Sequence, residues 1–141
     1  MGSSFGAKKH FACLERNLAS YNHVRLYNQA IGNQDGFIKL LEESATQNTR
    51  VLLEEGETRI SKLDSLDTEG IDMIKIDVEG LEMEVLKGAS DKLKNIKFIM
   101  LELNSNSERY GSSNIKITTY LEEIGFKLLI KTWPDQVYYK I

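Results

Sequence analysis

Three acidic residues beside two apolar runs are the side chains best suited to chemistry. Asp77 and Glu79 lie at the end of the apolar run 71–78, and Glu102 lies near the end of the run 97–103. In an open sheet of parallel strands, ligands bind at the carboxyl ends of the strands. A carboxylate there can accept a proton or a hydrogen bond, and hard divalent cations prefer such oxygen ligands. We therefore predict a site at this sheet edge, and a cation held by the same three side chains stays open as an alternative.

Glu79 also has a purely structural interpretation, which it shares with Glu82. Both residues stand where a helix is expected to begin, and a carboxylate there complements the helix dipole and caps the first turn. The residues alone leave both interpretations open for these two side chains. Asp77 differs, because a carboxylate on a buried strand needs a partner or a function.

The second half of the chain contains the elements that must position these carboxylates. The isoleucine-rich run between Gly70 and Gly80 is typical of a strand that is buried on both faces of a parallel sheet. Asn114 is a plausible N-cap of a later helix, and Gly125 a plausible stop. The order of strands and helices predicts an open α/β sheet with right-handed crossovers. The expected elements are strand 71–78, helix 81–94, strand 97–103, helix 114–125 and a final hairpin of strands 126–130 and 137–141.

The first half is less regular. Apolar residues at helical spacing predict a helix over 8–21, and alternating residues predict strands at 24–30 and 37–41 around a glycine-containing turn. The polar stretch 43–50 is expected to be an exposed loop. Short strands at 51–53 and 58–60 and a turn or short helix at 61–66 complete this half.

Composition limits the class of protein. The 141 residues carry a formal net charge of −3 and are 41% hydrophobic, which suits one globular domain. Mild acidity argues against a nucleic-acid partner, which would favour a basic chain. No apolar stretch approaches the roughly 18 residues that span a bilayer, so we expect no membrane partner. With no apolar signal core near the N-terminus and the single cysteine Cys13, we expect a cytoplasmic protein.

A long motif around Asp77 resembles a known family. Residues 71–82, IDMIKIDVEGLE, followed by VLKGA at 85–89, look like the signature of the FkbM-type methyltransferases. Weaker similarity is seen in FACLERN at 11–17, NQAIGNQDG at 28–36 and YLEEIGF at 120–126. The resemblance covers about residues 10–141 and leaves 1–9 outside it. It implies a Rossmann-like fold that uses S-adenosyl-L-methionine to methylate hydroxyls of sugars or other small molecules.

The chain departs from this family in its first part. No two glycines are separated by a single residue, so the G-x-G cofactor fingerprint is absent. The acidic position that would bind the cofactor ribose falls on Phe5. The chain thus resembles the C-terminal two-thirds of the family domain, truncated on its N-terminal side, with a mixed sheet that ends in an antiparallel hairpin.

Truncation has a structural consequence for the sheet. The order in the family is 3-2-1-4-5-7-6, so loss of strands 1 and 2 exposes an edge of the strand at 71–78. Such an edge favours pairing with another chain. Either 24–30 pairs directly with 71–77, or a homo-oligomer partner or a further segment of a longer chain covers the edge.

The resemblance also implies roles for particular residues. Asp77 is the first candidate, as a base, a substrate hydrogen-bond acceptor or the partner of the cationic sulfonium. Glu79 is the second catalytic candidate, and Glu102 is expected to bind the hydroxylated small-molecule substrate. Asn28 and Gln29 match positions that approach the cofactor adenine. The alternative function is a non-catalytic, methyltransferase-like binding or scaffold domain, which the missing glycine loop favours.

Overall fold

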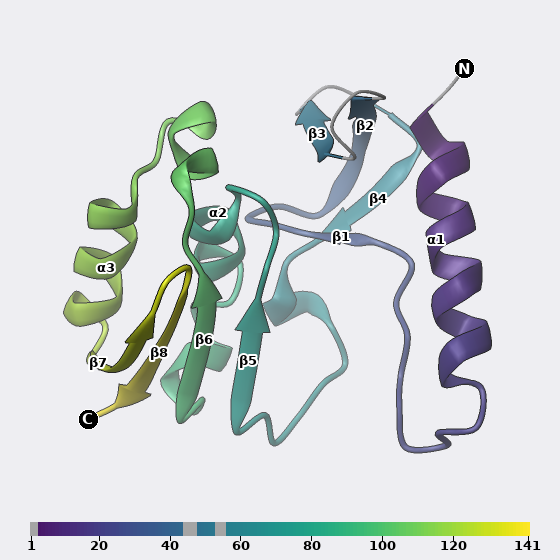
Figure 1. Cartoon of the computed structure of the whole chain (residues 1–141). Helices are drawn as coiled ribbons and strands as arrows, with labels where there is room; N and C mark the ends of the chain where they lie inside the picture. The colour runs from purple at the N-terminus through teal and green to yellow at the C-terminus, as the bar shows by residue number, and fades with distance from the viewer. Residues whose placement is uncertain (1–2, 44–47, 53–55) are drawn as a thin grey trace. The chain divides into compact units, whose positions relative to one another are not determined.

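The computed structural model describes residues 3–43, 48–52 and 56–141 (Figure 1). The chain divides into two compact units. The first contains residues 1–30 and 35–61, and the second contains residues 31–34 and 62–141.

The first unit combines one helix with an antiparallel sheet. Helix α1 spans Ser3–Leu18, so it begins five residues before the predicted helix and ends three residues earlier. Strand β2 (Gly36–Glu43) pairs antiparallel with β3 (Asn48–Leu52) and with β4 (Thr58–Ser61). The strands predicted at 37–41, 51–53 and 58–60 are therefore present as far as the structure describes them. The loop expected over 43–50 is wrong at 48–50, which belongs to β3, while 44–47 lie outside the described residues.

The strand predicted at 24–30 is wrong. Only Ala30–Ile31 forms a strand, β1, and it belongs to the sheet with the order β1-β4-β2-β3. Val24 and Tyr27 are exposed, so the apolar alternation of this segment does not mark a buried face. A short apolar stretch becomes a strand only where a neighbouring strand supplies hydrogen bonds, and 24–29 has none among the described residues.

The second unit is built on a mixed sheet. Its strands are β5 (Met73–Ile76), β6 (Phe98–Glu102), β7 (Phe126–Thr132) and β8 (Asp135–Lys140), in the spatial order β5-β6-β8-β7. β5 and β6 run parallel, with Ile76 opposite Leu101, whereas β8 runs antiparallel to both β6 and β7. This arrangement confirms the predicted α/β class and the antiparallel C-terminal hairpin. It also reproduces the last four strands, 4-5-7-6, of the family order 3-2-1-4-5-7-6.

Two helices and three short 3-10 segments complete this unit. Helix α3 (Asn114–Glu123) matches the prediction except for its cap, because Ser113 and not Asn114 accepts the Lys116 N–H through its side chain. Helix α2 (Glu82–Lys87) is shorter than the predicted helix over 81–94, and a 3-10 segment follows at Lys92–Lys94. Further 3-10 segments lie at Leu63–Ser65 and Ser105–Tyr110.

A single apolar cluster lies between these helices and the sheet. The fully buried residues come from every layer of the unit, including Leu86 of α2, Ile99 and Leu101 of β6, Leu121 of α3, and Tyr138 of β8. The predicted helical spacing over 81–94 therefore identified the correct buried face, since Leu93 is also buried although the helix ends at Lys87. Burial of this face holds β5 and β6 side by side.

β5 is an edge strand of the second sheet. Among the described residues β5 pairs with β6 alone, so direct pairing between 24–30 and 71–77 is not seen. Across the described part of the chain, no helix is both long and apolar enough to cross a membrane.

Candidate functional site

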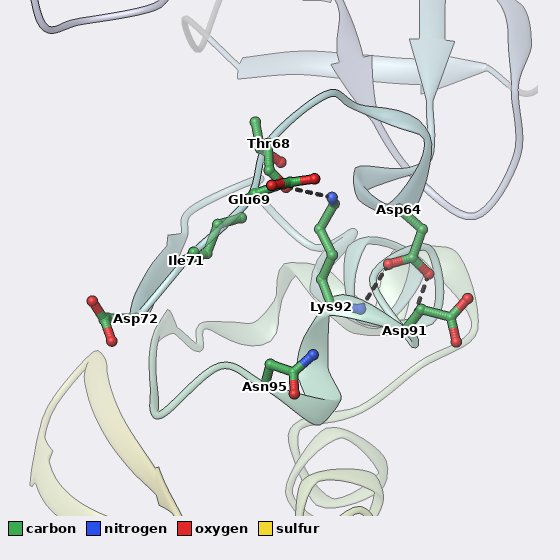
Figure 2. Close-up of a pocket in the computed structure, with 9 residues that line it drawn as sticks. Asp64, Thr68, Glu69, Ile71, Asp72, Asp91, Lys92 and Asn95 are labelled. Carbon is green, nitrogen blue, oxygen red and sulfur yellow. Dashed lines mark hydrogen bonds between the residues drawn. The ribbon is translucent and has the colours of Figure 1, made fainter.

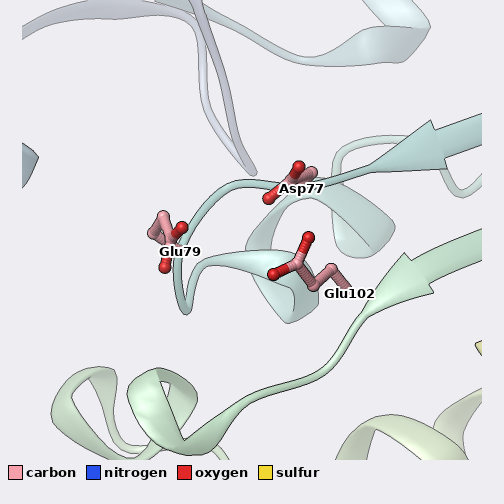
Figure 3. Close-up of side chains that lie close together, drawn as sticks. All are labelled: Asp77, Glu79 and Glu102. Carbon is pink, nitrogen blue, oxygen red and sulfur yellow. The ribbon is translucent and has the colours of Figure 1, made fainter. Parts of the chain in front are cut away.

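The parallel strands β5 and β6 bring the three predicted carboxylates together (Figure 3). Asp77 follows the last residue of β5, Glu79 lies on the turn that leads to α2, and Glu102 is the last residue of β6. One carboxylate oxygen from each side chain lies within 4.8 Å of the others. The side chains therefore meet at the carboxyl ends of neighbouring parallel strands, where the sequence predicted them.

The turn after β5 has a strained backbone that aims Glu79 into this cluster. Glu79 has a φ of 52°, which is unusual for a residue with a side chain, and its Oε2 accepts a hydrogen bond from Asn104 Nδ2 at 3.3 Å. Left-handed backbone at a non-glycine residue costs about 1–2 kcal/mol. Such strain is often found at functional sites.

Glu82 has the structural role that its position allowed. Its side chain is buried, and Oε1 accepts the backbone N–H of Gly80 at 2.9 Å. This hydrogen bond satisfies a donor in the turn before α2 and places a carboxylate in the first helical turn. The structural interpretation is thus confirmed for Glu82, whereas the Glu79 side chain is exposed beside Asp77 and Glu102.

Charge is unevenly distributed over the cluster. Lys75 Nζ lies 3.1 Å from Asp77 Oδ2, and this hydrogen bond with the Asp77 charge raises the pKa of Lys75. The nearby Asp77 charge raises the pKa of Glu102, with smaller contributions from desolvation, Asp135 and Glu79. The pKa of Glu102 is thus raised above its ordinary value, and Asp77 forms an ion pair with Lys75.

The three carboxylate oxygens of the cluster could also bind a cation. Three carboxylate oxygens in so small a space repel one another, and a positive charge between them would relieve that repulsion. The cluster alone does not distinguish a metal ion from an organic cation such as a sulfonium.

Asn28 and Gln29 belong to the first unit, whereas all three carboxylates belong to the second. The described structure therefore does not place the two predicted groups beside each other. Asn28 is exposed. Gln29 Oε1 accepts from Ser61 Oγ at 3.5 Å, and its Nε2 is buried with no hydrogen-bond partner among the described residues. Phe5, which stands where the family has its acidic ribose-binding residue, lies within helix α1.

A hollow of about 470 Å³ lies at the opposite, amino ends of β5 and β6 (Figure 2). Several of its polar groups bind one another, although the buried Thr68 Oγ1 has no partner among the described residues. Asp64 accepts the backbone N–H groups of Asp91 and Lys92, both at 3.0 Å, and Lys92 Nζ donates to the carbonyls of Leu66 and Thr68. These contacts tie the loop before β5 to the segment before β6, and they explain the hollow as part of the scaffold.

Sequence reasoning missed two neighbours of the cluster. Asp135 lies directly opposite Glu102 on β8, and Asn104 donates to Glu79. The register of a hairpin against a distant strand cannot be derived from local sequence, so Asp135 gave no signal. Asn104 did give one, since it closely follows the predicted strand that contains Glu102.

The second unit is a mixed α/β sheet with acidic residues at the carboxyl ends of its parallel strands, and comparisons identify the family. The model of the methyltransferase FkbM domain matches residues 4–128, so the chain belongs to the FkbM methyltransferase family. A comparison with curated proteins gives no match.

One solved structure shares the fold. It is the crystal structure of methyltransferase FkbM from Methylobacillus flagellatus KT, with a TM-score of 0.59 and 15% sequence identity. The match covers 94% of this chain and 33% of that chain. The present chain thus spans about a third of the length of that protein, and the likeness bears on the fold alone.

Proposed function

We propose that this chain takes part in methyl transfer from S-adenosyl-L-methionine to a hydroxyl group of a small molecule such as a sugar. The observation that carries the proposal is the meeting of Asp77, Glu79 and Glu102 at the carboxyl ends of β5 and β6 in a chain of the FkbM family. Ligands of open α/β sheets bind at this edge.

The described residues fit part of the cofactor. S-adenosyl-L-methionine supplies an electrophilic methyl group on a sulfonium cation when it is bound. The acidic cluster suits that cation. The sequence offers no G-x-G turn for the remainder of the cofactor.

Each of the three carboxylates has a different role in the proposed reaction, according to its surroundings. Methyl transfer to oxygen requires a hydroxyl held in line and a group that takes its proton. Glu102, whose pKa is raised, acts as the proton acceptor in addition to its expected role in substrate binding. Asp77, ion-paired with Lys75, accepts a hydrogen bond from the substrate and faces the positive donor. Glu79, which accepts a hydrogen bond from Asn104, orients the substrate.

The alternative proposal is a non-catalytic binding or scaffold domain. The missing G-x-G turn and the coverage of only a third of the solved relative favour it. The intact motif at 71–82 favours an enzyme.

Calorimetric titration of the 141-residue chain with S-adenosyl-L-methionine and S-adenosylhomocysteine separates the two proposals. Micromolar binding of either compound that Asp77→Asn weakens supports the methyltransferase. The matched control is Asp91→Asn, which removes an exposed carboxylate from the hollow at the opposite, amino ends of β5 and β6. Absence of binding would reject catalysis by this chain and favour the scaffold.

A further inference from the structure

We propose that the open edge of β5 pairs antiparallel with the β5 edge of a second copy of this chain, with Ile76 on the twofold axis. The proposal concerns assembly, and it uses Lys75 and Asp77 at the edge of the sheet that also carries the acidic cluster. It starts from the observation that β5 has one partner strand among the described residues and that Met73, on this strand, is 49% exposed.

The backbone fixes which residues have hydrogen-bonding groups on the open side. The carbonyl of Asp72 accepts hydrogen bonds from the N–H groups of Lys97 and Phe98, so it faces β6. Peptide groups alternate between the two sides of an extended strand, so the N–H and C=O of Lys75 face away from β6, and those of Asp77 would do so where the added strand prolongs β5 by one residue. An added strand would therefore bind these two residues.

Charge selects one register for the added strand. With Ile76 opposite Ile76 of the second copy, Lys75 lies opposite Asp77 of the second copy, and the reverse pair forms by symmetry. Moving the axis by one residue in either direction places Lys75 opposite Lys75 or Asp77 opposite Asp77, and like charges directly opposite each other are unfavourable. The edge is self-complementary in one register.

The other face of the strand agrees with this register. Ile74 and Val78 would lie opposite each other across the axis, which joins apolar side chains to apolar side chains. Ile74, Val78 and Val85 line a hollow of about 280 Å³ beside β5 whose walls are mainly apolar. The second copy would supply side chains to fill part of that space, so both faces of the strand favour the same partner.

Sedimentation velocity of the purified chain tests whether the dimer forms. A strand-to-strand interface is small, so we expect a weak dimer, and concentrations from about 10 µM to about 1 mM should be covered. A monomer over the whole range would overturn the proposal and would leave the edge to a different protein or to a further segment of a longer chain.

Two charge-reversal variants test the register. Lys75→Glu and Asp77→Lys each place like charges opposite each other, so each alone should weaken the dimer at least about tenfold. In a mixture of the two variants, both substituted side chains face each other with opposite charges, and the unchanged Asp77 of one copy faces the unchanged Lys75 of the other. A heterodimer should therefore form with about the wild-type affinity. The ion pair within each variant chain stays broken, so repair of that pair cannot explain the recovery. Failure of the mixture to associate would reject the register.

Controls keep this test independent of folding. Lys97→Glu reverses the charge of another exposed lysine of the same unit, which pairs with Asp72 at 2.7 Å, and it should dimerise as wild type does. Circular dichroism checks that each variant folds. Amide hydrogen exchange of the unmodified chain gives a second measurement: the Lys75 and Asp77 amides should gain protection as concentration rises, and unchanged exchange would also contradict the proposal.

Discussion

The carbonyl oxygen of Gly32 lies against the Cα of Gly88, so close that a Cβ at position 88 would stand 1.8 Å from it. This contact joins the segment 31–34 to the end of α2 and gives the family motif VLKGA a packing explanation. Gly88 has an ordinary helical φ, so it is the space and not the backbone conformation that requires glycine.

We therefore expect Gly88→Ala to be strongly destabilising. Neither backbone segment can yield without losing core contacts, and overpacking of this kind costs about 1–3 kcal/mol or more. Urea denaturation followed by circular dichroism measures the loss in free energy of unfolding. Gly111→Ala is the control: its φ is 75° and no atom lies within 4 Å of the added Cβ, so only the backbone penalty of about 1 kcal/mol should appear. Equal losses in both variants would contradict the packing explanation.

A second prediction concerns the buried carboxylate of Glu82. Glu82→Ala leaves the Gly80 N–H without its acceptor in a buried turn and should lower the free energy of unfolding by about 1–3 kcal/mol. Glu82→Gln keeps an acceptor oxygen and should lose less. Glu84→Ala removes only a partly exposed ion pair with Lys87 and should change stability by less than about 0.5 kcal/mol. Thermal unfolding of the three variants checks this order, and a Glu82→Ala variant as stable as Glu84→Ala would contradict it.

The sequence was most informative where burial and topology agree. The runs that contain Ile74 and Ile99 were predicted as neighbouring parallel strands because they are apolar without alternation, and that pairing places Asp77 beside Glu102. The prediction failed at 24–30, because alternation around Val24 cannot show whether a partner strand is available. The end of α2 was missed for a similar reason: the carbonyl of Gly32, distant in sequence, packs against Gly88. Long-range contacts of this kind leave no local pattern.

The third prediction concerns the pH dependence of the acidic cluster. Because the Asp77 charge is the largest cause that raises the pKa of Glu102, Asp77→Asn should lower the pKa of Glu102 toward its ordinary value. Asp135→Asn removes a smaller cause and should lower it less. Lys75→Met removes a nearby positive charge, which itself lowers this pKa, and should raise it. Carboxyl-carbon NMR titration of Glu102 measures the three shifts whether or not the chain is active.

Activity should follow the same titration if Glu102 accepts the proton. A base works only when it is deprotonated, so kcat/KM should rise as pH increases through the pKa of Glu102. The acid limb should move to lower pH in Asp135→Asn and to higher pH in Lys75→Met. A profile that stays fixed while the NMR titration moves would exclude Glu102 as the proton acceptor and return that role to Asp77.

The last prediction uses the buried Tyr138. Its hydroxyl donates to Gln136 Oε1 at 2.6 Å, and burial raises its pKa from 10.0 to about 12. The folded state thus holds the proton more tightly than the unfolded chain. Between about pH 10 and pH 12 the unfolded chain releases this proton while the folded chain keeps it, so the contribution of Tyr138 to stability is complete below pH 10 and declines across that window.

Tyr138→Phe should remove this part of the alkaline decline. At neutral pH the variant should be less stable by about 1 kcal/mol or more, because Gln136 Oε1 loses its donor in a buried site. Urea denaturation at intervals from pH 7 to pH 12 measures both effects, with Tyr139→Phe as the control at the neighbouring, half-buried position. The stability curves of wild type and Tyr138→Phe should approach each other as pH rises, since only the wild type loses the stabilisation that comes from a protonated Tyr138. Parallel curves would show that the tyrosine ionises alike in the folded and unfolded chains.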